Sequence, residues 1–211
     1  RQLDRLKNAR TPSEVVIATT TADKDEDIVD LGVSQGVPVV RGPEDDVLGR
    51  YAQAAKEHSA DVVVRVTGDC PLVDPKILDR CVETFVLHDL VDYVSNTLQR
   101  TYPRGLDVEV LSSHVLNIAA KEAQEMSDRE HVTRFIWRQP DRFRLMSLLD
   151  DTDNSQLRWT VDCQEDLEVV RSIFRDLYAI DPNFDYAAML QHAESNPSVH
   201  SLNQGVVQKV V

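Results

Sequence analysis

Two aspartates follow apolar runs that are typical of β-strands. Asp69 comes shortly after the run 61–66, and Asp162 comes directly after the run 157–161. Ligands of open α/β sheets gather at the carboxyl ends of the strands, so we expect both carboxylates to share one cleft. Such a pair suits Mg²⁺, which completes its octahedron with water and substrate phosphate. The structural alternatives are that Asp162 caps the helix beginning at Gln164 and that Asp69 closes a turn.

A cysteine follows each of these aspartates, Cys70 and Cys163. Successive side chains of an extended chain point to opposite faces, so we expect both thiols to turn into the core. A mixed aspartate and cysteine site for a softer metal is therefore disfavoured. With Cys81 the chain has three cysteines and no CxxC spacing, which argues against a disulfide framework or structural zinc and favours reduced thiols.

A basic and aromatic loop, 101–109, supplies a second group of candidates. Pro103 and Gly105 favour a tight turn from which Arg104 projects, and Asp107 and Glu109 fall on one face of the next strand. The guanidinium could grip a carboxylate or phosphate bidentately, while the acids could bind sugar hydroxyls or a second cation. The alternative is an internal ion pair between Arg104 and Asp107.

The remaining candidates have equally plain structural alternatives. In the run 127–131, Ser127 or Asp128 with Glu130 could form a helix capping box and leave His131 on a helix surface. The hydroxyls at 19–21 could read a base edge or cap the next helix. Arg41 and Arg50 flank the acidic run 43–46, and an arginine within a helix is commonly solvated.

Composition limits the classes of partner. The 211 residues include 23 Lys and Arg against 36 Asp and Glu, a net charge of −13, so a nucleic acid or an anionic membrane would be repelled. An anionic ligand must therefore meet a local arginine cluster or a metal ion. No apolar run approaches the roughly 18 residues of a membrane span, and no secretion signal is evident, so we expect a cytoplasmic protein of one domain.

β-branched runs alternate with helical patterns, which predicts βαβ units around a mostly parallel sheet. Predicted strands are 14–20, 37–40, 61–66, 92–97, 107–111, 143–149 and 157–161, and predicted helices are 25–33, 45–58, 75–87, 113–125, 128–138 and 164–177. Unbroken valine runs indicate strands covered on both faces, whereas the alternation at 107–111 indicates a half-exposed strand. We assign no structure to the tail after Asn196, which is polar and irregular apart from VVQKVV (206–211).

Four motifs in series carry a resemblance to a known family. They are RVTGDCPLVDP (65–75), PRGLDVEV (103–110), DREHVT (128–133) and RWTVDCQEDLE (158–168). With them the stretch from about Val15 to Leu177 resembles the acylneuraminate cytidylyltransferase-like family, and its spore-coat polysaccharide biosynthesis branch most of all. The resemblance implies a Rossmann-like, three-layer nucleotide-diphospho-sugar transferase fold, a homodimer, and the coupling of CTP to an acidic or related sugar with release of pyrophosphate.

The resemblance also implies roles for particular residues. Asp69 and Asp162 would bind Mg²⁺, and Arg104 would join them in catalysis. The nucleotide side would comprise Thr20, Arg41, Asp46, Arg50 and Arg65, and the sugar side Asp107, Glu109, Arg129, Glu130 and His131. We expect residues of about 98–150 to form the sugar-side and dimerisation region.

The family's opening strand and its phosphate loop, of the form AR-x-GS-x-RLPGK, have no match here, and residues 1–7 resemble the helix that follows that loop. We therefore expect a chain truncated at its amino end, with low stability and little turnover if no other residues belong to it. The alternatives are a glycosyltransferase that uses a nucleotide-sugar on the same fold and a non-catalytic nucleotide-binding subunit. For the intact enzyme we expect in-line attack of a sugar hydroxyl on the α-phosphorus, with Glu109 or His131 as the base.

Overall fold

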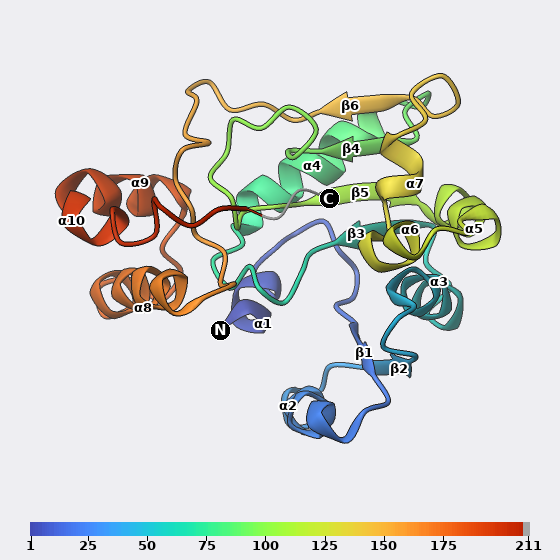
Figure 1. Ribbon diagram of the computed structural model, residues 1–211, viewed down its shortest axis with the longest axis horizontal. Coiled ribbons are helices and arrows are strands. Elements are labelled where there is room, and N and C mark those ends of the chain that lie inside the picture. The colour runs from blue at the N-terminus through green and yellow to red at the C-terminus, as the bar shows by residue number, and fades with distance from the viewer. Residues whose placement is uncertain (209–211) are drawn as a thin grey trace.

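The computed structural model describes residues 1–208, which form a mixed α/β fold (Figure 1). Within them, a four-stranded sheet has the order β3 (Val62–Arg65), β5 (Glu109–Ser112), β4 (Tyr93–Ser95) and β6 (Leu145–Ser147). A separate parallel pair joins β1 (Ile17–Thr20) to β2 (Val39–Gly42). In the larger sheet β4 is parallel to β6 and only β5 is antiparallel to its neighbours, so the predicted α/β fold with mostly parallel strands is confirmed.

The helices follow the predicted order, with two additions near the carboxyl end. They are α1 (Gln2–Leu6), the 3-10 turn η1 (Asp23–Asp25), α2 (Glu26–Gln35), α3 (Val47–Glu57), α4 (Pro75–Leu87), α5 (Ser113–Glu122), α6 (Met126–His131), α7 (Arg134–Trp137), α8 (Gln164–Tyr178), α9 (Tyr186–Ser195) and α10 (Pro197–His200). In α4, Asp74 caps the amide groups of Lys76 and Ile77 and Pro75 occupies the first turn, as the sequence predicts. No helix among residues 1–208 is long and apolar enough to cross a membrane.

Two predicted elements are wrong in part, and a segment without a prediction contains a helix. The helix predicted over 128–138 is broken into α6 and α7, because Val132 adopts a φ of 56°. Residues 157–161 form no strand and make only an isolated bridge between Arg104 and Arg158. The tail, to which the sequence assigned no structure, contains α10, and the stretch 206–211 extends beyond the described residues.

The two faces of the larger sheet have separate cores. The paired residues Tyr93 and Leu111 belong to a cluster with α3, α5 and α7, whereas the next pair, Val94 and Val110, packs with α4 and α8. This alternation is the two-residue period of a strand covered on both sides. The prediction of a half-exposed strand at 107–111 is therefore wrong: β5 is central, and its Glu109 is buried.

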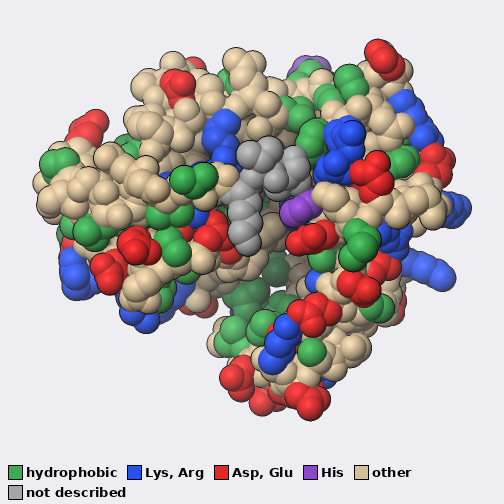
Figure 2. All heavy atoms as spheres, viewed as in Figure 1, with side chains coloured by type: hydrophobic (Ala, Val, Ile, Leu, Met, Phe, Trp, Pro, Cys, Tyr) green, Lys and Arg blue, Asp and Glu red, His purple; other side chains and the backbone are tan. Residues whose placement is uncertain are grey.

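A groove separates the two sheets. Its volume is about 490 Å³, and valines of β3 and residues of β1 line it with apolar side chains of α1, α2 and α3. Figure 2 shows green side chains inside this hollow, beside the part of the molecule that carries α2. All four β3 side chains are only partly buried, so the prediction that the valine run is covered on both faces is wrong.

Candidate functional site

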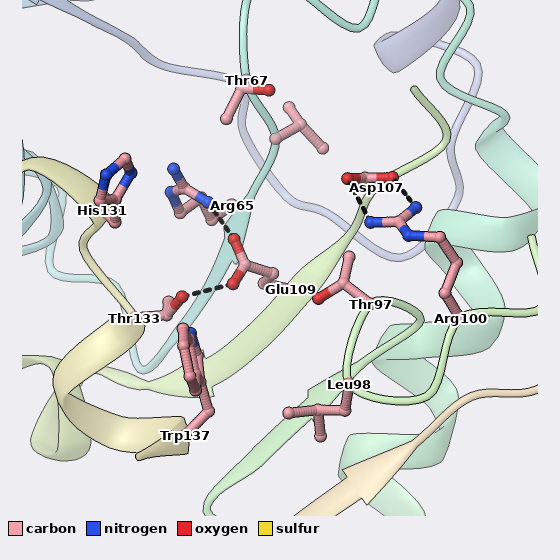
Figure 3. Close-up of a pocket in the computed structure, with 11 residues that line it drawn as sticks. Arg65, Thr67, Thr97, Leu98, Arg100, Asp107, Glu109, His131, Thr133 and Trp137 are labelled. Atoms are coloured by element: carbon pink, nitrogen blue, oxygen red, sulfur yellow. Dashed lines mark hydrogen bonds and ion pairs between the residues drawn. The ribbon is translucent and has the colours of Figure 1, made fainter. Parts of the chain in front are cut away.

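A cavity of about 350 Å³ opens at the end of β3, between the larger sheet and the α6–α7 turn (Figure 3). Its lining comprises Arg65, Val66, Thr67, Thr97, Leu98, Arg100, Asp107, Glu109, His131, Thr133 and Trp137. Ligand sites are commonly of about 300 to 1,000 Å³ and combine apolar walls with a few fixed polar groups. Four of the predicted site residues meet here: Arg65, Asp107, Glu109 and His131.

Glu109 lies at the bottom of this cavity with both carboxylate oxygens occupied. It accepts hydrogen bonds from Arg65 of β3, from Tyr93 of β4 and from Thr133 at the start of α7. Burial lowers the pKa of Arg65, but the charge and hydrogen bond of Glu109, together with Tyr51 and Tyr93, outweigh it and hold that pKa above its usual value. Glu109 therefore joins three elements around the cavity and is poorly suited to accept a proton.

Asp107 lines the side of the cavity opposite Glu109, where it pairs with Arg100 (Figure 3). Two hydrogen bonds of 2.6 and 2.9 Å join the guanidinium to both carboxylate oxygens. The considered ion pair between Arg104 and Asp107 is not formed, because Arg100 occupies the carboxylate. This bidentate pair fixes the orientation of both side chains at the cavity wall.

Arg104 lies beside the segment that precedes Asp162. Its backbone amide donates to the carbonyl of Leu157, and its carbonyl accepts from the amide of Trp159. Among residues 1–208 its guanidinium makes no hydrogen bond, and burial, followed by the charge of Arg100, lowers its pKa. A half-buried cation beside another cation favours the approach of an anionic ligand.

Asp69 and Asp162 lie on adjacent segments. The amide of Val161 donates to the carbonyl of Asp69 at 2.8 Å, and the Thr160 hydroxyl donates to the Asp69 carboxylate at 3.1 Å. The Asp162 carboxylate is exposed and accepts a hydrogen bond from Arg158 at 2.5 Å. The alternative that Asp162 caps a helix does not apply, because α8 has no side-chain cap. The alternative for Asp69 does apply: Asp69 lies in a turn closed by the hydrogen bond from the Cys70 amide to the Thr67 carbonyl, while its carboxylate contacts Thr160.

The donor set at these segments fits Mg²⁺ in type. Two carboxylates and a hydroxyl supply hard oxygen atoms, and Mg²⁺ needs no more protein ligands than that when water and phosphate complete its shell. Among residues 1–208 no group of three or more His, Cys, Asp and Glu side chains could hold a metal ion. Cys70 is buried, and this burial, with the charge of Asp69, raises its pKa, which disfavours a thiolate ligand. Cys163 is only half-buried, so the expectation that both thiols enter the core is wrong for it.

The residues predicted for the nucleotide side lie apart from the cavity, except Arg65. Thr20 donates to Asp25, and Arg41 donates to the Thr20 carbonyl at 2.9 Å and to Glu26 at 2.7 Å. Arg50 is 7% exposed rather than solvated, and it donates to the carbonyl of Glu44. These contacts shape the turns after β1 and β2, and the roles of the three residues in nucleotide binding stay predictions.

Asp46 and Arg129 pair with each other, although they were assigned to opposite sides of the site. Asp46 caps α3 through the amide of Gly49 and accepts a hydrogen bond of 2.6 Å from Arg129. The considered capping box at 127–130 is not formed, because α6 begins after Glu125 without a side-chain cap. Glu130 is exposed, 4.0 Å from His131, so of these two only His131 lines the cavity.

Several lining residues were missed. Thr67 and Thr133 lie within motifs quoted above, so their positions next to Asp69 and His131 were available as a signal. Arg100, immediately before the loop 101–109, could have been found as the nearest cation to Asp107. Trp137 and the residues Thr97 and Leu98 carry no comparable signal, because only the fold brings them to the cavity.

Comparisons with known proteins agree with one another. A family model described as cytidylyltransferase matches residues 1–203. An uncharacterized protein of Methanocaldococcus jannaschii is 35% identical over 98% of this chain and 84% of its own. The spore coat polysaccharide biosynthesis protein SpsF of Bacillus subtilis is 31% identical over 76% of this chain and 67% of its own.

Solved structures show the same similarity in three dimensions. A cytidylyltransferase from Leptospira borgpetersenii covers 100% of this chain and 86% of its own length, with a TM-score of 0.90 and 31% identity. A CMP:2-keto-3-deoxy-manno-octonic acid synthetase, solved in complex with CTP, covers 82% of this chain and 86% of its own at a TM-score of 0.59. The latter is 15% identical and supports the fold alone.

Proposed function

Because the chain belongs to the cytidylyltransferase family, we propose that it couples CTP to an acidic or related sugar, giving a CMP-sugar and pyrophosphate for surface polysaccharide biosynthesis. The family implies a nucleotidyltransferase. The sugar is inferred from the names of two relatives, SpsF and a 3-deoxy-manno-octulosonate cytidylyltransferase of Chloroherpeton thalassium, which is 34% identical over 41% of this chain and 34% of its own.

The observation that carries the proposal is the position of the cavity beside the loop of Asp69. Thr67 lines the cavity and lies two residues before Asp69, so a sugar held there would present a hydroxyl near the two carboxylates. Hydroxyl groups of Thr67 and Thr97, the fixed pair of Arg100 and Asp107, and the Trp137 ring offer the contacts that a sugar requires. Arg104 would bind the carboxylate of an acidic sugar or a phosphate.

In the proposed reaction the sugar hydroxyl oxygen attacks the α-phosphorus of CTP. A new oxygen–phosphorus bond forms as the bond to the β-phosphate bridge oxygen breaks, and pyrophosphate leaves with that electron pair. Asp69 and Asp162 would hold Mg²⁺, which supplies charge neutralisation at the phosphates. His131 is better placed than Glu109 to receive the hydroxyl proton, because Glu109 already accepts three hydrogen bonds. The remaining task of the site is positioning.

Pyrophosphate release tests the proposal directly. The protein is incubated with each nucleoside triphosphate and a panel of acidic and neutral sugars, with Mg²⁺, and CTP with an acidic sugar is expected to give the fastest release. Asp69→Asn should reduce the rate by about 100-fold or more, since charge stabilisation is the main contribution lost. The exposed Asp141→Asn is the matched control and should retain the wild-type rate.

Three outcomes would contradict the proposal. Release of a nucleotide from an added nucleotide-sugar, with no pyrophosphate from CTP, would indicate a glycosyltransferase. Binding of CTP in titration calorimetry without turnover would indicate a nucleotide-binding subunit. Turnover by Asp69→Asn at the wild-type rate would remove the assignment of Asp69 and Asp162 as the metal ligands.

A further inference from the structure

Four side chains near the carboxyl end form a continuous chain of hydrogen bonds, hereafter the histidine chain. The Trp159 Nε1 atom lies 3.2 Å from His200 Nδ1, His200 Nε2 lies 3.1 Å from His192 Nδ1, and His192 Nε2 lies 3.1 Å from Asp176 Oδ2. Trp159, His192 and His200 are all buried. The histidine chain thus joins α8, α9 and α10 to the segment 157–162 (Figure 1).

The direction of every proton in the histidine chain follows from its two ends. The Trp159 indole can only donate, so His200 Nδ1 must accept and the His200 proton must reside on Nε2. His192 Nδ1 therefore accepts, and the His192 proton resides on Nε2, from which it is donated to the Asp176 carboxylate. Both imidazoles are neutral and in the same tautomer, and no other arrangement satisfies all three contacts.

The segment that receives this support also carries part of the proposed site. On either side of Trp159, Arg158 bridges to the Arg104 loop and Thr160 contacts the Asp69 carboxylate. The Trp159 amide itself donates to the Arg104 carbonyl. The position of the buried indole therefore sets the position of both contacts.

We propose that the histidine chain holds the segment 157–162 in place only while His192 and His200 are neutral, so that uptake of one proton releases the segment. A second proton on His192 would lie on Nδ1 and face the Nε2–H of His200. If the His200 proton moves to Nδ1, that clash is relieved, but the moved proton then faces the indole N–H of Trp159. One contact is lost in either case, and Asp176 and His200 act as positioning residues for the segment.

The charged groups in contact with the histidine chain lie on α8. Asp176 of α8 is the only carboxylate among residues 1–208 that hydrogen-bonds to either imidazole, and Arg175 and Ser172 of the same helix also donate to it. Burial, followed by the charge of His192 on α9, lowers the pKa of His200 to about 4, below the ordinary value of about 6.5. The unfolded chain then binds more protons between these values, so the stabilisation is complete above about pH 6.5 and is lost as the pH falls toward 4.

Nitrogen NMR of the histidines tests the proton arrangement without any substrate, so its outcome is independent of the proposed function. At pH 7.5, ¹⁵N-histidine spectra of the whole protein should show both imidazoles as the Nε2–H tautomer. On titration downward, the indole N–H signal of Trp159, assigned with Trp159→Phe, should shift together with the imidazoles. Either imidazole as the Nδ1–H tautomer, or an indole signal that stays fixed while the imidazoles take up protons, overturns the proposal.

Thermal unfolding of variants supplies a second test. The wild type should lose at least about 4 °C in Tm between pH 7.5 and 5.0. The exposed control His88→Gln should lose as much, whereas His200→Gln, which cannot reproduce both contacts of the imidazole, should lose half of that or less. Equal losses in His200→Gln and the wild type overturn the proposal. If His200→Gln does not fold, His192→Gln takes its place under the same criterion.

Discussion

The cations of the cavity region differ in what already binds them. Arg65 and Arg100 each have a carboxylate partner, Glu109 and Asp107. The guanidinium of Arg104 makes no hydrogen bond within residues 1–208 and lies near the charge of Arg100. A paired cation mainly fixes geometry, whereas an unpaired one has unmet charge for an incoming anion. This difference supports the proposal that Arg104 binds an anion, while the two pairs fix the walls of the cavity.

The pair of Arg100 and Asp107 yields a prediction with an internal control. Arg100→Lys keeps the charge but loses the planar fork, so we expect a loss of about 1 to 3 kcal/mol in the free energy of unfolding, measured with urea. Arg142 forms the same bidentate geometry with Glu122 at an exposed position, with hydrogen bonds of 2.6 and 2.8 Å. Arg142→Lys should cost less than about 0.5 kcal/mol, and equal costs would contradict the assignment.

Glu109 yields a larger effect. Glu109→Gln removes the charge beside Arg65 and leaves a mostly buried guanidinium without its partner. We expect a loss of about 2 to 4 kcal/mol in the free energy of unfolding, because an uncompensated buried charge is the dominant penalty. Guanidinium denaturation of Glu109→Gln measures it, with the exposed Glu130→Gln as control. A loss below about 1 kcal/mol would show that Arg65 does not depend on this carboxylate.

For single residues, the sequence predicts which residue types lie close together but not which side chains pair with each other. It placed Asp107, Glu109 and His131 in one region because they lie in recognisable motifs. It could not predict that Arg100 rather than Arg104 pairs with Asp107, since both cations are close in sequence and only the loop path decides. Nor could it predict that Asp46 pairs with Arg129, because the two residues are 83 positions apart.

Among the elements, the segment 157–162 shows why a strand-like sequence need not form a strand. Its backbone groups form hydrogen bonds to two different loops in turn. The Trp159 amide donates to the Arg104 carbonyl, and the Val161 amide donates to the Asp69 carbonyl. No continuous strand lies beside it within residues 1–208, so a single bridge forms instead. The close approach of the Arg104 loop to this segment occurs at Gly105, where a Cβ atom would lie 2.4 Å from the backbone of Trp159 and of Thr160.

This close approach predicts a sharp difference between two glycines. Gly105 has a φ of 105°, so Gly105→Ala adds backbone strain to the clash. We expect a loss of about 2 kcal/mol or more in the free energy of unfolding, with a fall in pyrophosphate release as the two loops separate. At Gly68 a Cβ atom meets nothing within 4 Å, so Gly68→Ala should change stability by less than about 1 kcal/mol. Urea unfolding of both variants measures the two changes in the free energy of unfolding.

Elements with a strong local signal were predicted closely, and those set by distant contacts were not. Helix α4 begins where Asp74 and Pro75 indicate, because capping is local. The burial of β5 could not be predicted, since the partners that allow Glu109 to be buried come from β3, β4 and α7. The break at Val132 likewise has no sequence signal, because a β-branched residue disfavours a positive φ.

On the scale of the whole molecule, the groove divides the fold. The larger sheet has a core on each face, whereas the pair of β1 and β2 contributes little buried apolar surface. Within residues 1–208, β1 and β3 each pair with a strand on one side only and have partly exposed apolar side chains toward the groove. The composition predicted one domain, but it carries no information on how evenly that domain is stabilised.

Uneven pairing predicts uneven protection from hydrogen exchange. Amides of β4 and β5 lie inside the sheet and under both cores, so they should exchange only by near-global unfolding. Amides of β1 and β3 border the groove and should open with a free energy lower by about 2 kcal/mol or more, because edge strands lose fewer contacts on opening. Native-state exchange followed by mass spectrometry measures both sets in one experiment. Strand β3 is the stricter comparison with β5 than β1 is, because one edge of β3 is itself hydrogen-bonded to β5. Equal protection of β3 and β5 would mean that the groove is closed in solution and that the two sheets behave as one.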